Sequence, residues 1–167
     1  VKYGRSICEP RYDYLVIRDR LDGVTDFGDQ LAIVEVRKKG GLIDTLGNII
    51  VPPIYDAVTY YSEGFAWFKV DDKYGLIDRK GKVVQRPQFD RWGYFENGLA
   101  WVNVGAKWDE KIHRMRGGKW GLINTKGGFQ LDLQFDSLKT RRGDSTRVWL
   151  GKQMGTVDRS GNLHWEK

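Results

Sequence analysis

The stretch KYGLIDRKG, at residues 73–81, is one of four related stretches that decide the fold. GGLIDTLG stands at residues 40–47, KWGLINTKG at residues 119–127 and KQMGTVDRSG at residues 152–161. The glycine before the Leu-Ile-Asp position recurs after 34, 46 and 34 residues (75 − 41, 121 − 75 and 155 − 121), at Gly41, Gly75, Gly121 and Gly155. Self-similarity at a fixed period predicts a repeat architecture, in which one link carries 12 extra residues.

Other landmarks keep the same spacing. An aromatic residue and an aspartate follow the first three stretches, and an Ala or Thr comes ten residues later, at Asp56 and Ala66, Asp90 and Ala100, and Asp136 and Thr146. The 12-residue insertion therefore lies between Val104 and Gly118. The N-terminal segment fits the same pattern through Gly4, Pro10, Tyr12 and Asp13, with about nine extra residues within 18–29.

These motifs resemble the WG-repeat (KWG) family of β-repeats, which occurs mainly in bacterial proteins. KYGLIDRKGKVV followed by Pro-x-Phe-Asp, and GLAWV followed by KWGLIN, carry the resemblance, which covers about nine-tenths of the chain. The stretches at Gly41 and Gly155 depart from it, because no aromatic residue precedes the glycine. The resemblance implies a non-catalytic, all-β repeat module.

Local chemistry predicts three strands in each copy. Residues 65–70 (FAWFKV) are rich in aromatic residues and end at a β-branched valine, which favours a strand. Asp71-Asp72 predicts a tight turn, residues 73–77 the returning strand, and residues 78–81 a second turn before a third strand. Pro87 is expected to end this ladder because it has no N–H to donate. The copies would then be joined through the Pro-x-aromatic-Asp element.

The predicted fold is therefore all-β, with tandem antiparallel meander or hairpin repeats at a period of about 34 residues. We expect one domain over residues 1–167, with a partial repeat at 1–40, repeats at about 41–74, 75–117 and 118–151, and a partial repeat at 152–167. An open or slightly curved array is favoured. A closed propeller or barrel, completed by the two partial terminal copies, is the alternative.

Two repeated residue types have structural explanations. Glycine weakens a strand unless another group approaches closely, so Gly75 and Gly121 are expected to pack one repeat against the next. The Asp after Leu-Ile is expected to accept hydrogen bonds in a turn. Asn124 replaces it in one copy, and an Asn keeps the acceptor but not the charge, which argues against a metal or catalytic role.

Composition excludes several classes of function. No apolar run has the length of a membrane span, and no phosphate-binding, dinucleotide-binding or hydrolase motif occurs. Cys8 and two histidines are too few for a zinc site of the usual kind, and residues 26–29 lack the ligand pattern of an EF-hand loop. We therefore expect no enzyme activity, cofactor or metal. The sequence leaves the compartment open, with the cytoplasm favoured.

Binding residues are expected outside the repeated frame, because insertions in repeat proteins map to loops, often on a binding face. Three segments qualify: the insertion at 105–117, the aromatic connection at 91–97 and the basic loop at 139–142 together with Arg147. Phe95 and Tyr61 are expected in the core. The candidate partner-binding residues are Trp92, Tyr94, Lys107, Trp108, Lys111, Arg114, Arg116, Arg141, Arg142 and Arg147.

The expected partner is a protein or peptide, which could add a strand to an exposed sheet edge. The net charge of +6 and the pI near 9.4 raise nucleic acid as an alternative, since basic residues among aromatics can track phosphates and stack bases. However, many lysines, Lys73 and Lys119 among them, recur at turn positions, where charge is common. Glycan or cell-envelope binding by exposed rings is a further alternative.

Overall fold

The computed structural model describes residues 14–16, 31–44, 46, 48–140 and 145–167. Within these residues the chain forms sixteen strands and no helix, arranged in four antiparallel sheets of four strands each. In every sheet the strands lie side by side in chain order, as in a meander. The predicted all-β meander is confirmed.

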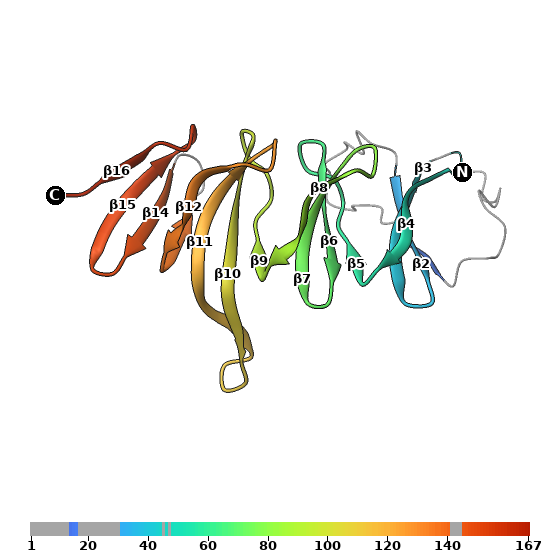
Figure 1. The fold of residues 1–167 in the computed structure, drawn as a ribbon, viewed down its shortest axis with the longest axis horizontal. Coiled ribbons are helices and arrows are strands. Elements are labelled where there is room, and N and C mark those ends of the chain that lie inside the picture. Colours follow the sequence, from blue (N-terminus) through green and yellow to red (C-terminus); the bar gives the residue numbers. More distant parts are fainter. Residues whose placement is uncertain (1–13, 17–30, 45, 47, 141–144) are drawn as a thin grey trace, which may run out of the picture.

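The sheets are numbered from the N-terminus (Figure 1). Sheet 1 holds β1 (Tyr14–Val16), β2 (Leu31–Val36), β3 (Lys39–Asp44) and β4 (Ile49–Tyr55). Sheet 2 holds β5 (Ala57–Val58), β6 (Phe65–Val70), β7 (Lys73–Asp78) and β8 (Val83–Phe89). Sheet 3 holds β9 (Arg91–Trp92), β10 (Leu99–Asp109), β11 (Arg114–Asn124) and β12 (Phe129–Phe135). Sheet 4 holds β13 (Ser137–Thr140), β14 (Ser145–Leu150), β15 (Gln153–Asp158) and β16 (Leu163–Trp165).

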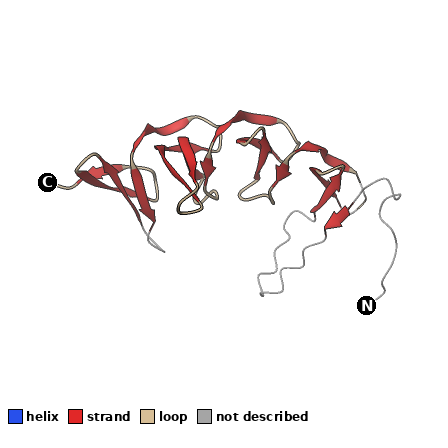
Figure 2. Ribbon diagram, turned by 90° about the horizontal axis from the view of Figure 1, so that it is seen from below, coloured by secondary structure: helices blue, strands red, loops and turns tan. Residues whose placement is uncertain are grey.

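The four sheets form an open, gently curved row. Sheets 1 and 4 lie at opposite ends of this row (Figure 1), and the row bends into a shallow arch (Figure 2). None of the sheets built from the described residues closes into a barrel. The predicted open or slightly curved array is therefore confirmed, and the closed alternative, in which the terminal copies complete each other, is wrong.

The prediction of three strands per copy is wrong, because the connection between copies is itself a strand. Residues after the Pro-x-aromatic-Asp element pair with the next hairpin, as Ala57 with Lys69, Arg91 with Asn103 and Ser137 with Trp149. These strands are short, and their sequences do not alternate in polarity. A sheet therefore takes its first two strands from one copy of the repeat and its last two from the next.

Pro87 does not end the ladder, contrary to the prediction. Strand β8 continues past it to Phe89, which pairs with Tyr74, while Gln85 pairs with Leu76. The register shifts between these two pairs, so a bulge takes up the residues around the proline. A proline is tolerated at a bulge because no ladder donor is required there.

The strand glycine makes room for this bulge, and its close contacts lie inside its own sheet rather than between neighbouring sheets. A Cβ at Gly75 would lie 2.7 Å from the Gln85 carbonyl oxygen, and one at Gly41 would lie 2.5 Å from the Val51 carbonyl oxygen. Such distances leave no space for a side chain. The glycine is thus required because the bulged fourth strand approaches the third strand so closely.

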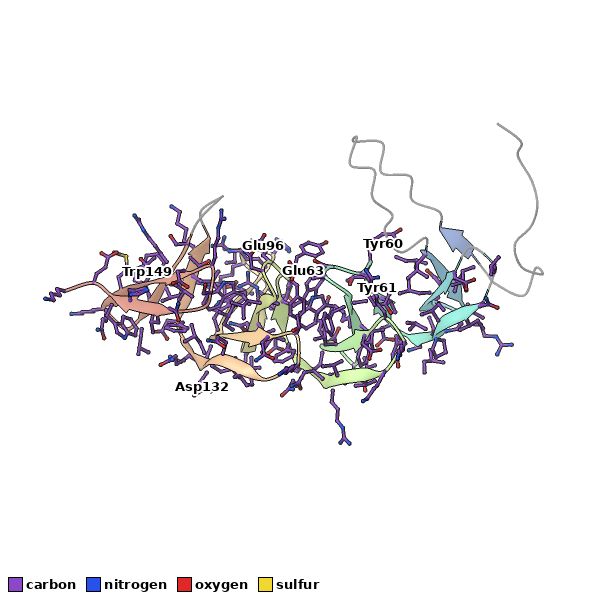
Figure 3. The ribbon with its side chains drawn as sticks, turned by 90° about the horizontal axis from the view of Figure 1, so that it is seen from above. Tyr60, Tyr61, Glu63, Glu96, Asp132 and Trp149 are labelled. Atoms are coloured by element: carbon purple, nitrogen blue, oxygen red, sulfur yellow. The ribbon has the colours of Figure 1, made fainter. Side chains whose placement is uncertain are left out.

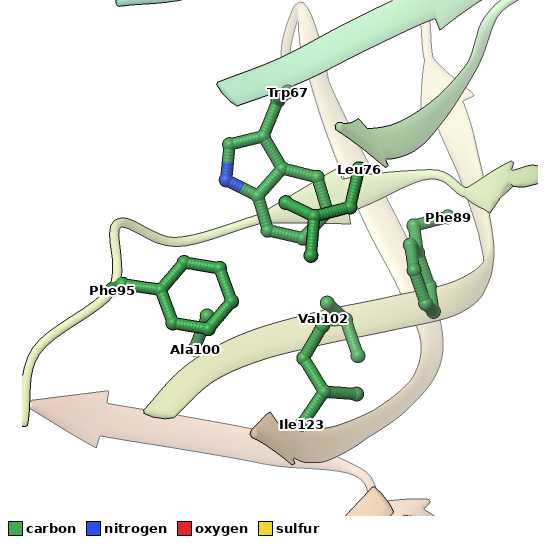
Figure 4. Packing of buried hydrophobic residues seen from close by; sticks show 7 residues of the cluster. All are labelled: Trp67, Leu76, Phe89, Phe95, Ala100, Val102 and Ile123. Carbon is green, nitrogen blue, oxygen red and sulfur yellow. The ribbon is translucent and has the colours of Figure 1, made fainter. Parts of the chain in front are cut away.

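The hydrophobic core lies between neighbouring sheets rather than within one. Alternate residues of one strand serve two interfaces: Trp67 packs toward sheet 3, whereas Ala66 and Phe68 pack toward sheet 1. Figure 4 shows the interface of sheets 2 and 3, built from Trp67, Leu76, Phe89, Phe95, Ala100, Val102 and Ile123. A single sheet therefore cannot bury its own core, and stacking supplies the stability.

The 12-residue insertion extends a hairpin, so the prediction that it forms a loop is wrong. Strands β10 and β11 each have 11 residues, whereas β6 and β7 each have six. The additional pairs run from Ala106 with Gly117 to Asp109 with Arg114. Continuing an existing ladder satisfies the inserted backbone groups directly. The extended hairpin projects beyond the row in Figure 1.

Candidate functional site

The aspartate of each Pro-x-aromatic-Asp element joins two successive hairpins. Asp56 pairs with Lys39 at 2.5 Å and accepts a hydrogen bond from the N–H of Asp71 at 3.0 Å. Asp136 pairs with Lys119 at 2.5 Å and accepts from the N–H of Gly151 at 2.6 Å. The lysine lies 17 residues before the aspartate and the amide 15 residues after it.

The third junction has the same geometry, with Asp90 bound to Lys73 and to the N–H of Gly105. Lys73 and Lys119, expected as solvated charges at turns, instead hold successive hairpins together, as Lys39 does. These three lysines are therefore structural residues.

The Asp after Leu-Ile caps its turn, as predicted. Asp78 accepts hydrogen bonds from the N–H groups of Lys80 and Lys82, both at 2.9 Å. Asn124 accepts from the N–H groups of Lys126 and Gly128. The amide oxygen replaces the carboxylate without loss of either bond, which explains the substitution.

The glycine that closes this turn, rather than the strand glycine, makes the close contact with the neighbouring sheet. A Cβ on Gly81 would lie 2.4 Å from the Ile50 carbonyl oxygen of sheet 1. Gly127 lies against Val84 and Gln85 of sheet 2, and its carbonyl accepts a hydrogen bond from the Gln85 side chain at 2.6 Å. Both glycines have positive φ, so the position needs a glycine for conformation and for space.

An open groove of about 670 Å³ lies mainly between sheets 3 and 4. One wall comes from sheet 3 and the other from sheet 4, and the loop before β10 closes one end. The apolar lining residues are Trp92, Tyr94, Leu99, Trp101, Trp120, Leu122, Leu138 and Val157. Apolar and aromatic walls with a few polar groups are typical of ligand sites.

Two predicted site residues, Trp92 and Tyr94, lie at this groove. Trp92 is part-buried, stacks on Trp67 with ring centroids 5.5 Å apart and meets Tyr74 edge-on at 5.9 Å. Tyr94 is 60% exposed and stands edge-on to Trp92 at 5.2 Å. Trp92 is thus largely a packing residue, and Tyr94 is the ring available to a partner.

Phe95 and Tyr61 belong to the core, as predicted. Phe95 is 3% exposed and packs between Phe65 and Trp67, at centroid distances of 5.2 and 6.2 Å. Tyr61 packs against the core between sheets 1 and 2, and its hydroxyl donates to the Asp78 carbonyl at 2.8 Å. Tyr60, Tyr61, Glu63 and Glu96 lie on one side of the row, and Asp132 lies on the other (Figure 3).

Charged groups surround the groove. Glu63, Glu96 and Asp158 bring carboxylates, and Arg159 brings a guanidinium. Glu63 accepts hydrogen bonds from the N–H groups of Asn97 at 2.9 Å and Gly98 at 2.7 Å, which fixes the adjacent loop. The Asn162 side chain and backbone N–H hold the pKa of Asp158 below its ordinary value. The described rim is therefore net acidic.

The predicted basic site on the insertion lies at the tip of the extended hairpin, at the other end of β10 from the groove. Trp108 is 53% exposed, and its ring stands 6.4 Å from that of His113. Lys107, Lys111, Arg114 and Arg116 are all exposed. Asp109 pairs with Arg116 at 3.5 Å, which reduces the positive charge of the tip.

The other predicted site residues lie neither at the groove nor at the tip of the extended hairpin. Arg147 lies in β14 and pairs with Thr156, next to the buried Thr146 and Val148. Strand alternation thus directs it away from sheet 3. Arg141 and Arg142 lie outside the described residues, as do Cys8 and residues 26–29.

Most residues of the groove walls carry no functional signal in the sequence. Trp101, Trp120 and Leu138 occupy regular strand positions, where an apolar residue indicates only packing. Arg91 lies over the Trp120 ring, with its guanidinium carbon 4.6 Å from the centroid, and steadies this wall. One sequence difference could have indicated the groove. The copies of the repeat differ at one residue of the loop that joins the first and second strands of each sheet.

In the part of the chain that the structure describes, no helix is long and apolar enough to cross a membrane. Nor do the described His, Cys, Asp and Glu residues gather in a group of three or more that could hold a metal ion.

Comparison with known proteins agrees with the repeat geometry. A family model described as "WG containing repeat" matches residues 41–74 and 74–108. Neither curated proteins nor solved structures gave a match. The matched copies contain the strand glycine, the capping aspartate and the junction aspartate described above, and the same geometry continues into sheets 3 and 4. Residues 41–108 of this chain are therefore two WG-containing repeats.

Proposed function

We propose that this array is a non-catalytic module that recognises a protein or peptide, and that the groove between sheets 3 and 4 is its binding site. The groove carries the proposal because it combines exposed aromatic surface, a volume suited to side chains and a polar rim. Deeply packed aromatic anchors surrounded by polar groups dominate the energetics of protein interfaces.

Four of the edge strands are poorly suited to pair with a partner strand. The edge strands β5 and β9 have two residues each, and β4 and β8 contain prolines. Short edges and prolines discourage the addition of a further strand. Recognition through side chains in the groove is therefore preferred over strand addition.

A random-peptide display library selected on the purified chain tests this function. Selected peptides are then titrated by isothermal calorimetry against the wild type, Tyr94→Ala and the control Trp108→Ala at the hairpin tip. We expect micromolar peptides whose binding Tyr94→Ala weakens and Trp108→Ala leaves unchanged. Failure to select any binding peptide would contradict the proposal.

Nucleic-acid binding is the second candidate, supported by the exposed basic residues around Trp108. The measurement is fluorescence anisotropy of a mixed-sequence oligonucleotide pool over a salt series. Binding that weakens steeply with salt and is lost in Lys107→Ala with Arg114→Ala would favour this candidate, because phosphate contacts release counterions. Binding of oligosaccharides in place of peptides would favour the glycan alternative, since exposed rings can stack on sugar faces.

A further inference from the structure

Two of the interfaces between sheets hold one aromatic side chain from the loop that precedes the two central strands of a sheet. In the interface of sheets 2 and 3, Phe95 is this side chain and packs against Phe65 and Trp67. In the interface of sheets 1 and 2, Tyr61 is the aligned residue and packs against the same core as Ile33. We call this aromatic side chain the plug.

The interface of sheets 3 and 4 has equivalent wall residues, but the sequence carries a different residue at the position of the plug. Register aligns Phe65 with Leu99, since they pair with Asp78 and Asn124, and Trp67 with Trp101, since they pair with Leu76 and Leu122. Leu99 and Trp101 both line the groove. The spacing from the junction aspartate aligns Arg141 with Tyr61 and Phe95.

The residues that bind the loop carrying the plug also differ between the second and third interfaces. The Ser62 hydroxyl donates to the Phe95 carbonyl at 3.2 Å, and Glu63 binds the next two turn amides. The third loop carries Glu96 and Asn97 at these positions. A serine hydroxyl and a carboxylate are thus replaced by a longer acid and an amide, and Glu96 is exposed at the groove.

From these observations we infer that the groove is the plug position of the third interface and takes an aromatic side chain supplied by a partner peptide. The partner's ring occupies the place that Phe95 occupies one interface earlier, against Leu99 and Trp101. Positively charged residues beside that ring fit the carboxylates of the rim. This inference rests on the proposed function and specifies its ligand.

The test uses N-acetyl-phenylalaninamide as a minimal plug, with N-acetyl-alaninamide as the matched control. Methyl signals of Leu99 and Leu138 and the indole N–H signal of Trp101 are followed by NMR during titration. We expect saturable shifts of these signals with the phenylalanine amide only, while the Trp108 indole signal stays in place. Equal shifts with both amides, or none at millimolar concentration, overturn the inference.

Two variants make the test specific to the plug. Arg141→Phe gives the fourth copy the aromatic residue that the second and third copies carry, and Arg141→Ala removes the same charge without adding a ring. We expect Arg141→Phe to raise the thermal midpoint and to abolish the shifts, whereas Arg141→Ala retains them. A folded Arg141→Phe protein that responds like the wild type overturns the inference.

Peptides separate this inference from the proposed function. A lysine-flanked phenylalanine peptide should bind at least about tenfold more tightly than its Phe→Ala counterpart, and a glutamate-flanked version should bind more weakly. If selected peptides bind equally well without an aromatic residue, the recognition function stands and the plug inference fails. If the phenylalanine amide occupies the groove but no peptide is selected, the plug position stands and the recognition function fails.

Discussion

At the scale of single residues, the strand glycine is the most constrained position of the repeat. Gly75 faces the Gln85 carbonyl and the Phe68 ring, and a Cβ added at Gly75 would lie 2.6–2.7 Å from both. We expect Gly75→Ala to lower the free energy of unfolding by about 1–3 kcal/mol, the usual cost of overpacking. Urea denaturation measures this.

Gly93→Ala is the matched control for that substitution. The nearest atom to a Cβ at Gly93 is the Trp101 carbonyl oxygen at 3.7 Å, an ordinary contact. We expect this variant to unfold close to the wild-type midpoint. A loss of stability equal to that of Gly75→Ala would contradict the argument from close approach.

The junction aspartates predict how stability depends on pH. Hydrogen bonds from Lys39 and the Asp71 N–H lower the pKa of Asp56, and those from Lys119 and the Gly151 N–H lower the pKa of Asp136. A carboxyl whose pKa is lower in the folded state stabilises the fold above its unfolded pKa of about 3.9, and this contribution is lost as pH falls through the folded pKa.

We therefore expect the free energy of unfolding to decrease as pH falls below about 4. Asp56→Asn and Asp136→Asn should reduce this decrease, because they remove the titrating group. The measurement is urea denaturation at several pH values. Unchanged pH dependence in the double variant would show that these pairs do not contribute.

At the scale of the structural element, the extended hairpin is separable from the array. Gly105 and Gly118 face each other at the base of this hairpin, and both have positive φ. The turn residues Asp71 and Asp72 of the shorter hairpin in sheet 2 also have positive φ. Deleting residues 106–117 would leave Gly105-Gly118 as a two-residue turn, and two positive φ values suit a type I′ hairpin.

We expect this deletion to lower the free energy of unfolding by about 1–3 kcal/mol, because it removes the Gly117 carbonyl that accepts a hydrogen bond from the buried Asn103 side chain. Chemical denaturation measures the change. The same variant tests the second candidate function, because oligonucleotide binding at the tip would be lost while peptide binding in the groove is retained. Global unfolding of the deletion variant would contradict a separable hairpin.

How far the sequence predicts each element depends on how local its cause is. The Asp78 cap and the Asp71-Asp72 turn are predicted correctly, because hydrogen bonds within four residues determine them. The short strands β5 and β9 are missed, because pairing with a hairpin some ten residues later forms them. The Lys–Asp junctions are missed for the same reason: a spacing of 17 residues becomes a contact only after the sheets stack.

The candidate site is harder to predict than the fold. Tyr94 stands out as an aromatic residue in a connection, but Trp101 and Leu138 follow ordinary strand patterns. They line the groove only because sheets 3 and 4 lie next to each other in the folded chain. The informative comparison, Tyr61 and Phe95 against Arg141, is visible in the sequence only once the structure shows what Phe95 does.

At the scale of the whole molecule, stability should vary along the row. Sheets 2 and 3 each pack against two neighbours, whereas among the described sheets 1 and 4 pack against one. In repeat proteins, stability is approximately a sum of unit and interface contributions. We expect hydrogen exchange, followed by mass spectrometry, to be slowest in β6, β7, β10 and β11 and faster in β2, β3, β14 and β15. Uniform protection along the chain would contradict this additive behaviour.

The division of each sheet between two copies of the repeat has a consequence for how such arrays can grow. A duplication within the coding sequence that spans one period inserts one complete sheet wherever its break points fall, because the strands lost on one side are restored on the other. The Lys–Asp junction and the closing glycine are duplicated with it, so the new sheet arrives with both of its interfaces already encoded. Lineages can therefore lengthen or shorten the row one sheet at a time while the residue at the plug position diverges separately in each copy.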